Sequence, residues 1–406
     1  MKSKIIAFAL FASTTAAVAF YPAYRSIGAI SPATVESAVL PPTANRSVGN
    51  EQPVVEVVFV LDTTGSMSGL IQAAKDKIWS IATTMAQAEP APLIRMGLVA
   101  YRDRGDAYVT RVVDLSTDLD TMYATLMDFQ ADGGGDGPES VNQALHDAVH
   151  KVSWTQDPSA YQVVFLVGDA PPHMDYQDDV KYPHTLAVAA EKGIVVNAIQ
   201  CGQNRWTLRE WQQIAQLGTG QYFQVDQAGS AVAVSTPFDE KLAALSAELD
   251  KTRLYYGSAE EKAKKQDKIE ATEKLHASAS VESRARRATF NASQSGGANL
   301  LGEGELVDDV ASGRVDLSDI APEELPEPMQ AMAPAAQQAL IAETAQRRTK
   351  LGRQIEELAH KREAYLDKEV RDSGIGEDSL DEKIYSAVRE QAAKKGLSYE
   401  ADAASY

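Results

Sequence analysis

Cysteine is almost absent from this 406-residue sequence, in which Cys201 is the only one. A single cysteine excludes a disulfide within the chain, so the fold must be stabilised by its core. No cysteine directly follows the N-terminal apolar run, so the sequence has no lipid attachment site there.

Positive charge is also scarce. The sequence has 39 Lys and Arg against 57 Asp and Glu, which gives a formal net charge of -18. Binding to nucleic acid or to anionic lipid needs a basic face, so this balance argues against both as partners. A negative surface does attract cations, which suits a metal site without establishing one.

The apolar run at the N-terminus is too short for an ordinary membrane-spanning helix, which needs about 20 residues. Lys2 and Lys4 precede the run Ile5–Ala19, which ends on the small-x-small pattern Ala-Val-Ala and is followed by Pro22. This pattern is typical of an export signal over residues 1–19 that is cleaved after Ala19. We therefore expect a periplasmic or secreted protein. An uncleaved signal that anchors the chain in the inner membrane is the alternative.

The sequence after the signal divides into three parts. Residues 20–52 are rich in Pro, Ser, Ala and Asn without periodicity, which is typical of a linker. Residues 53–256 alternate apolar runs with helix-length segments. Strands are expected at 54–61, 94–101, 111–115, 162–168, 194–199 and 221–225, and helices at 68–88, 118–129, 140–152, 185–192, 208–216 and 236–255. This alternation predicts one α/β domain, a three-layer, doubly wound, mostly parallel sheet with helices on both faces.

Residues 257–406 are expected to form a helical C-terminal region. The stretch 258–290 is dense in charge and poor in apolar residues, which favours a solvated helix or arm over a binding element. The stretch 334–371 is a long helix candidate. Its apolar stripe, Leu351, Ile355, Leu358 and Tyr365, favours packing within the chain over a coiled-coil seam between copies.

The strongest chemical signal lies where the first apolar strand ends. Asp62, Thr64 and Ser66 follow it at alternate positions. Alternate residues of an extended loop point to the same side, so the three side-chain oxygens can converge. In open α/β sheets, ligands bind at the carboxyl ends of the strands, where the winding reverses.

Two other segments are expected at the same edge of the sheet. Asp169 follows the strand at 162–168, and it points into the same crevice if that strand lies beside the first. The loop 132–139 (DGGGDGPE) contains three consecutive glycines, which let the backbone approach closely.

Oxygen ligands without imidazole or thiolate favour Mg²⁺, Ca²⁺ or Mn²⁺ over zinc or copper. A site of few carboxylates that keeps waters favours Mg²⁺, with Ca²⁺ or Mn²⁺ as alternatives. A plainer interpretation is that Asp62 and Asp169 only cap the helices that follow them. Two such aspartates together with two hydroxyls and a glycine loop favour the metal site.

These residues carry a resemblance to a known family. From about Val54 to Asp250 the sequence resembles the von Willebrand factor A domains, and residues 62–66 (DTTGS) look like their metal-ion-dependent adhesion motif, Asp-x-Ser-x-Ser. Thr64 stands where Ser is usual, a change that keeps the hydroxyl and is common in bacterial members. Asp169 matches the family's distal aspartate. The family's remaining ligand is usually a loop threonine, in whose place this sequence offers Asp136.

The resemblance implies how such a site would work. The ion keeps one position for an Asp or Glu of a protein partner, and the final helix of the domain shifts in switching members. The residues around the ligands are expected to form the rim that the partner contacts: Gly65, Met67, Gly135, Glu139 and His173.

We therefore expect an exported, non-enzymatic adaptor that binds an acidic residue of a protein partner through a divalent cation. No nucleic acid or small-molecule substrate is indicated, and a membrane is expected only if the signal is uncleaved. One alternative is a metal-dependent hydrolase that uses Asp62, Asp136 and Asp169. It lacks an evident general base or second ion, since His173 is the only base near by and its Pro-Pro lead-in looks structural. The other alternative is a scaffold that oligomerises through its C-terminal helices.

Overall fold

The computed structural model describes residues 52–135, 137–227, 234–373 and 380–399. The expected export signal, most of the linker and Asp136 lie outside the described residues. Within these ranges, no helix combines the length and the apolar composition that crossing a membrane requires.

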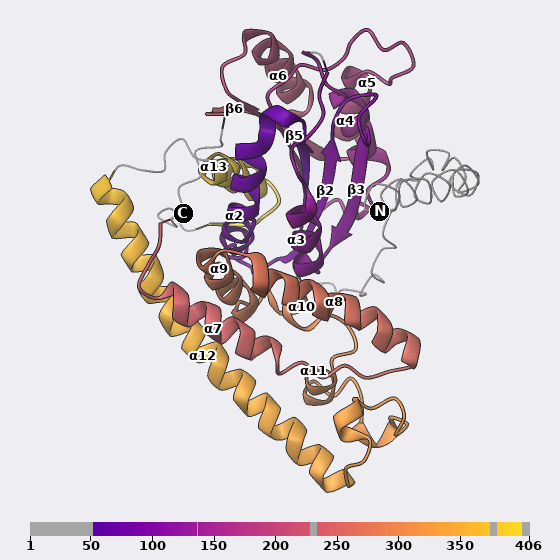
Figure 1. Cartoon of the computed structure of the whole chain (residues 1–406), viewed down its shortest axis with the longest axis vertical. Coiled ribbons are helices and arrows are strands. Elements are labelled where there is room, and N and C mark those ends of the chain that lie inside the picture. The colour runs from indigo at the N-terminus through magenta and orange to yellow at the C-terminus, as the bar shows by residue number, and fades with distance from the viewer. Residues whose placement is uncertain (1–51, 136, 228–233, 374–379, 400–406) are drawn as a thin grey trace, which may run out of the picture. The chain divides into compact units, whose positions relative to one another are not determined.

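A six-stranded sheet forms the centre of the fold, in the order β3-β2-β1-β4-β5-β6 (Figure 1). Its strands are parallel except β3, which is antiparallel to β2 at one edge. The strands are Val54–Asp62 (β1), Leu93–Tyr101 (β2), Thr110–Ser116 (β3), Tyr161–Gly168 (β4), Ile194–Cys201 (β5) and Thr219–Val225 (β6).

The sheet forms because its central strands are apolar on both faces. Along β1, Val57 and Phe59 belong to one buried cluster, and Val58 and Val60 belong to the other. A strand covered on both faces needs such a continuous apolar run rather than an alternating one. This is the pattern that residues 54–61 show.

Helices cover both faces of the sheet. The short helix η1 (Gly65–Met67), α2 (Ser68–Met85) and α3 (Leu119–Asp128) contribute to the first cluster. The second cluster includes residues of α4 (Val141–His150), α5 (Tyr182–Glu191) and α6 (Arg205–Leu217). The three-layer, mostly parallel α/β fold expected from the sequence is thus confirmed.

The region after β6 is helical, as expected. Its elements are α7 (Asp239–Asp250), α8 (Ala259–Ser278), α9 (Val281–Ala292), α10 (Gly297–Leu301), α11 (Leu306–Ala311), η2 (Leu317–Asp319), η3 (Glu327–Met329), α12 (Pro334–Ser373) and α13 (Leu380–Ala393). Leu351 and Ile355 of the long α12 lie in a buried cluster with residues of α7 and α9. The apolar stripe of α12 therefore packs within the chain.

A helix from the far end of the chain covers the sheet beside α2. Residues of α13 pack against α2, β4 and β6. The buried Gln391 accepts a hydrogen bond from the Tyr161 hydroxyl at 2.8 Å and donates one to Oδ1 of Asn197 at 2.8 Å. The α/β fold is therefore completed by residues beyond position 256.

From the sequence, we expect the helix at 236–255 to be the last helix that covers the sheet. Its counterpart α7 packs mainly against α9 and α12. Leucines of α7 lie in a buried apolar cluster with α9 and α12. Two ion pairs join the same helices: Asp250 of α7 pairs with Arg287 of α9 at 2.7 Å, and Asp239 pairs with Arg362 of α12 at 2.6 Å.

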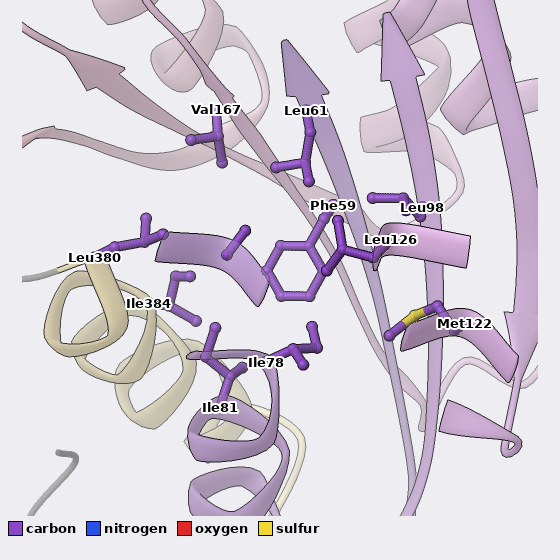
Figure 2. Close-up of a pocket in the computed structure, with 11 residues that line it drawn as sticks. Phe59, Leu61, Ile78, Ile81, Leu98, Met122, Leu126, Val167, Leu380 and Ile384 are labelled. Carbon is purple, nitrogen blue, oxygen red and sulfur yellow. The ribbon is translucent and has the colours of Figure 1, made fainter. Parts of the chain in front are cut away.

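A small apolar cavity of about 20 Å³ remains where α13 meets α2, α3 and the sheet (Figure 2). Leu380 and Ile384 of α13 face Phe59, Ile78 and other apolar side chains around it. A lining without polar groups offers water no hydrogen-bond partners, so we expect this cavity to be dry.

The interpretation of residues 258–290 as a solvated arm was wrong. Arg287 of α9 is fully buried, where it bonds both carboxylate oxygens of Asp120 in α3 at 2.5 and 2.6 Å. The neighbouring Lys268 of α8 is buried too and pairs with Asp118 at 2.7 Å. Burial of these charges is possible because acids of the α/β fold neutralise them, which a count of apolar residues cannot reveal.

Helices α8 and α9 attach at the end of the sheet opposite to the predicted metal site. Ser283 of α9 bonds to the Asp76 carbonyl in the middle of α2, and Arg286 bonds to Ser80 beyond it, whereas η1 and the start of α2 adjoin the end of β1. Figure 1 shows α5 and α6 at one end of the sheet and α8 and α9 at the other.

Candidate metal centre

The predicted site lies where the winding of the sheet reverses. The chain runs outward from β1 through β2 to β3 and then returns to β4 on the other side of β1. Leu61 of β1 pairs in register with Val167 of β4, so the residues after these strands start side by side. Such a switch point leaves a crevice at the carboxyl ends of the two strands. The expectation that the strand before Asp169 lies beside the first is confirmed.

Asp62, Thr64 and Ser66 converge as their alternate spacing predicted. The Asp62 Oδ1 accepts hydrogen bonds from the Thr64 amide at 2.9 Å and the Thr64 hydroxyl at 2.6 Å. The Thr64 and Ser66 hydroxyl oxygens are 3.5 Å apart. Asp62 and Thr64 are buried, while Ser66 is exposed.

Neither aspartate caps a helix. The N-cap residues of η1 and α2 are Thr64 and Met67, and neither side chain accepts a hydrogen bond from the backbone of its helix. The helix after Asp169 is α5, whose N-cap is Lys181. Capping therefore does not explain the presence of Asp62 or Asp169.

One carboxylate oxygen of Asp62 is left without a partner. The buried Oδ2 has no hydrogen bond among the described residues, and the same holds for the buried hydroxyl of Tyr101. Both atoms adjoin Gly168, where an added Cβ would lie 3.1 Å from the Asp62 Oδ2 and 2.5 Å from the Tyr101 hydroxyl. Only glycine fits at this position. Burial raises the pKa of Asp62 to about 7, against hydrogen bonds from Thr64 that lower it.

The glycine loop is fixed between the loops after β1 and β2. The Gly65 amide donates to the Gly133 carbonyl at 3.3 Å, and the Gly134 amide donates to Asp106 at 3.0 Å. Gly133 and Gly134 have φ of 80° and 83°, a conformation that favours glycine. Any side chain at Gly133 would also overlap the Asp106 carboxylate.

Glu139, at the end of this loop, is an internal carboxylate. It is buried, and its Oε2 has no hydrogen-bond partner among the described residues. Its Oε1 adjoins Gly134, which in turn adjoins the Thr64 side chain. Burial raises the pKa of Glu139 to about 9, and the charges of Asp62, Asp103, Asp106 and Asp169 add to the rise. The site therefore gathers acids that repel one another.

Asp169 joins the cluster through a residue that the sequence analysis did not single out. Gln227, just after β6, donates from Nε2 to the Asp169 Oδ2 at 2.6 Å and to the Ser66 carbonyl at 3.4 Å. The side-chain amide of Gln227 thus links the Asp169 carboxylate to the backbone carbonyl of Ser66. A lone glutamine after an edge strand has no distinctive sequence pattern, and only the adjacency of β5 and β6 brings it to the site.

Three of the five expected rim residues are buried rather than exposed. Met67 belongs to the apolar cluster beneath α2, and Glu139 is internal, as described above. His173 stacks on Tyr176 with the ring centres 3.9 Å apart, and it pairs with Asp175 at 2.8 Å and with Asp103 at 3.3 Å. The other two, Gly65 and Gly135, are exposed. Met67, Glu139 and His173 are thus not part of an exposed rim, because sequence proximity to a ligand does not indicate exposure, and contact of a partner with Gly65 and Gly135 stays a prediction.

Positive charge near the cluster serves other groups. The buried Arg102 donates to the carbonyls of Thr63 at 3.1 Å and Gln130 at 2.7 Å. In the described parts of the chain, no Lys or Arg forms an ion pair with Asp62, Glu139 or Asp169. Likewise, no three His, Cys, Asp or Glu side chains there form a ligand cluster on their own. A cation at this site would therefore need the hydroxyls as well.

With this geometry in view, comparison with known families decides the domain type. Residues 56–237 match the family model of the von Willebrand factor A domain. This part of the chain is a von Willebrand factor A domain. The match includes β1 to β6 and every described residue of the predicted metal site, and it ends before α7. Domains of this kind suggest a role in protein interaction or adhesion.

Curated relatives are similar over a short stretch only. A putative ariadne-like RING finger protein of Acanthamoeba polyphaga mimivirus is 25% identical over 124 residues, 30% of this chain and 12% of the relative. The alpha-protein kinase vwkA of Dictyostelium discoideum is 28% identical over 121 residues, 29% of this chain and 19% of the relative. The similarity thus spans less than a fifth of either relative.

Solved structures are similar to less than half of this chain. Proximal thread matrix protein 1 from the mussel byssus, also solved with a zinc-occupied MIDAS motif, has a TM-score of 0.34. Two of its structures are 17% and 18% identical, and each match covers 43% of this chain and 42% of that one. The SpRpn10 VWA domain is 13% identical with a TM-score of 0.33, over 43% of this chain and 89% of that domain.

Proposed function

We propose that the von Willebrand factor A domain binds a divalent cation through Asp62, Thr64, Ser66 and Asp169, and through it an acidic residue of a protein partner. Asp136 stays a predicted fifth ligand. The proposed protein is a non-enzymatic adaptor, and Mg²⁺ is the proposed ion, with Ca²⁺ or Mn²⁺ as alternatives.

The observation that carries this proposal is a buried acidic cluster without a counter-charge. The Asp62 Oδ2 and the Glu139 Oε2 are buried and without partners among the described residues. Burial raises the pKa of Asp62 to about 7 and that of Glu139 to about 9, so without a counter-ion these acids hold protons near neutral pH, and a cation would take the place of those protons. A hard cation suits this set of carboxylate and hydroxyl oxygens.

A bound cation would balance the carboxylates and offer residual positive charge to a carboxylate from outside. Asp62 and Thr64 would hold it from below, because they are buried. Ser66 and Asp169 would hold it from the exposed side, where Gln227 keeps Asp169 in place.

Thermal unfolding with and without Mg²⁺ tests the cation site. Saturating Mg²⁺ should raise the unfolding temperature of the wild type, since a ligand at 100 times its Kd stabilises a fold by about 2.7 kcal/mol. Asp62→Asn keeps the shape of the side chain but removes its charge, so it should abolish this rise. Without metal it should unfold at the wild-type temperature or above, because one buried acid has been removed from the cluster.

Asp157→Asn is the matched control, because Asp157 is an exposed aspartate in the loop before β4, at the far end of that strand. It should respond to Mg²⁺ like the wild type. An equal Mg²⁺ response of wild type and Asp62→Asn, or no response of the wild type, would refute the site.

Affinity capture from the native envelope then tests the adaptor role. A partner retained with Mg²⁺, and lost both with chelator and with Asp62→Asn, would support it. Turnover of a substrate by the purified chain would instead favour the hydrolase.

Export is a separate proposal, supported by Lys2, Lys4 and the apolar run that ends at Ala19. Cell fractionation and N-terminal sequencing test it. A mature chain that begins at residue 20 outside the cytoplasm is expected, and an intact cytoplasmic chain would contradict it.

A further inference from the structure

The first turn of α6 combines an exposed tryptophan with two arginines beside the predicted metal site. Trp206 is 81% exposed, and the next most exposed large apolar side chain among the described residues, Val180, is 46% exposed. Arg205 and Arg209 are exposed on the same helix. Tryptophan and arginine are the residues that most often dominate binding energy in protein interfaces.

Trp206 is held close to the site by its own helix. The hydroxyl of Thr207, the next residue, donates to the Asp169 backbone carbonyl at 2.8 Å. Asn204 caps the helix by accepting from the Trp206 amide at 2.9 Å. One turn further, the buried Trp211 donates to the Ala170 carbonyl at 3.0 Å. The exposed indole therefore stands on a backbone that is anchored to the segment carrying Asp169.

Charge distinguishes this turn from the other loops at the same edge. In the loop after β4, Asp178 and Asp179 are paired with Arg104, and Asp175 is paired with His173. Arg205 and Arg209 have no acidic partner among the described residues. In a chain with a net charge of -18, two unpaired arginines beside an exposed indole form a local positive surface.

We propose that Arg205, Trp206 and Arg209 form a second contact for the partner, which binds an acidic segment that contains an apolar residue. The inference rests on the proposed function, because the partner's metal-binding Asp or Glu would bring this segment alongside α6. The guanidinium groups would pair with its carboxylates, and the indole would cover its apolar side chain.

Peptide arrays test this surface on the purified full chain. The probes are nine-residue peptides with a central Asp, in which flanking Glu, Lys, Leu, Phe and Gly residues are varied at each position. With Mg²⁺, the wild type should prefer peptides that carry acids and one apolar residue on one side of the Asp.

Trp206→Ala should lower the affinity for the best peptide about tenfold and remove the apolar preference, since truncation of an interface hot spot costs at least that much. The double variant Arg205→Glu, Arg209→Glu should reverse the preference from acidic to basic flanks. In both variants the need for the central Asp and for Mg²⁺ should persist.

Matched controls come from exposed residues elsewhere. Leu217→Ala removes an exposed apolar residue at the other end of α6, and Arg353→Glu reverses an exposed charge on α12. Both should keep the wild-type preferences.

The outcomes separate this inference from the proposed function. Binding that needs Mg²⁺ and the central Asp but is equal in wild type and α6 variants would overturn the inference alone. Binding that needs Trp206 but neither Mg²⁺ nor the Asp would overturn the proposed function alone. Wild-type protein that binds Mg²⁺ in calorimetry but no peptide overturns the inference. Binding that depends on Trp206 for phosphatidylglycerol vesicles but not for any peptide would also overturn the inference, because it would indicate that α6 contacts a membrane surface.

Discussion

Arg287 shows how a single side chain can join distant parts of a chain. It is fully buried, and it bonds Asp120 of the α/β fold and Asp250 of α7 with one guanidinium group. A bidentate arginine between two acids satisfies most of its donors, so the charges can be buried together. Burial alone would raise the pKa of each acid, but the Arg287 charge, its hydrogen bonds and the neighbouring cations together outweigh burial and hold both pKa values below their usual range.

Loss of Arg287 should therefore be severe. Arg287→Ala removes the cation that two buried carboxylates share, although Lys268 stays near Asp120 and His276 near Asp250. We expect the free energy of unfolding to fall by about 3–5 kcal/mol. Urea unfolding followed by circular dichroism measures it. Arg286→Ala is the control and should cost far less, because Arg286 is only half-buried, and its guanidinium donates to the Ser80 hydroxyl of α2 at 2.9 Å. Similar losses for both variants would show that the buried pairing is unimportant.

The same pairing predicts a pH dependence. Asp120 and Asp250 have lowered pKa values when folded, so their contribution to stability is complete above the unfolded value of about 3.9 and is lost as the pH falls below it. Asp250→Asn should be less stable than the wild type at pH 6. This difference should shrink in urea titrations between pH 5 and pH 2.5. A difference that stays constant with pH would contradict the assigned charge state of Asp250.

At the scale of elements, α13 acts as part of the α/β core. Leu380 and Ile384 are buried against the sheet and border the small cavity in Figure 2. Leu380→Ala enlarges this cavity, so we expect a loss of about 2–5 kcal/mol. Chemical unfolding measures it, with Lys394→Ala, an exposed residue just after α13, as a control that should change little. A cost below about 1 kcal/mol would mean that α13 is only loosely attached.

The strands and the first ligands were predictable because their signals are local. Residues 54–61 are a continuous apolar run, and Asp62, Thr64 and Ser66 converge within one loop. The burial of Glu139 was not predictable, since it depends on how the glycine loop lies between two other loops. The role of α13 was not predictable for a similar reason, since an amphipathic pattern shows that one face of a helix is buried but not which element buries it.

At the scale of the whole molecule, residues after 373 should be needed for the stability of the α/β fold. A chain that stops at Ser373 lacks α13 and exposes apolar residues of β1 and β4, such as Phe59 and Val167. We expect a lower urea midpoint and increased binding of an apolar dye.

A synthetic peptide of residues 380–399 added to the shortened chain should restore the midpoint in part. The same peptide with Ile384→Asp should not, because an unpaired charge cannot be buried at that position. An unchanged midpoint in the shortened chain would show that α13 is dispensable.

Helices α8 and α9 lie at the opposite end of the sheet from the predicted metal site. Buried ion pairs of Arg287 with Asp120 and Asp250 join α9 to the rest of the fold, whereas carboxyl oxygens at the site have no hydrogen-bond partner among the described residues. This contrast explains why the same residue type, aspartate, serves stability at one end and is proposed for binding at the other.

The distance in sequence between β1 and α13 also has a consequence for how the protein is made. Synthesis on the ribosome proceeds from the N-terminus, so all six strands emerge before residues 380–393 exist. Until α13 is synthesised, the apolar residues of the sheet beside α2 that it buries are exposed to solvent, and the nascent chain can aggregate through them. A chaperone that holds this face, or transport across a membrane before folding, would protect the newborn chain from aggregation.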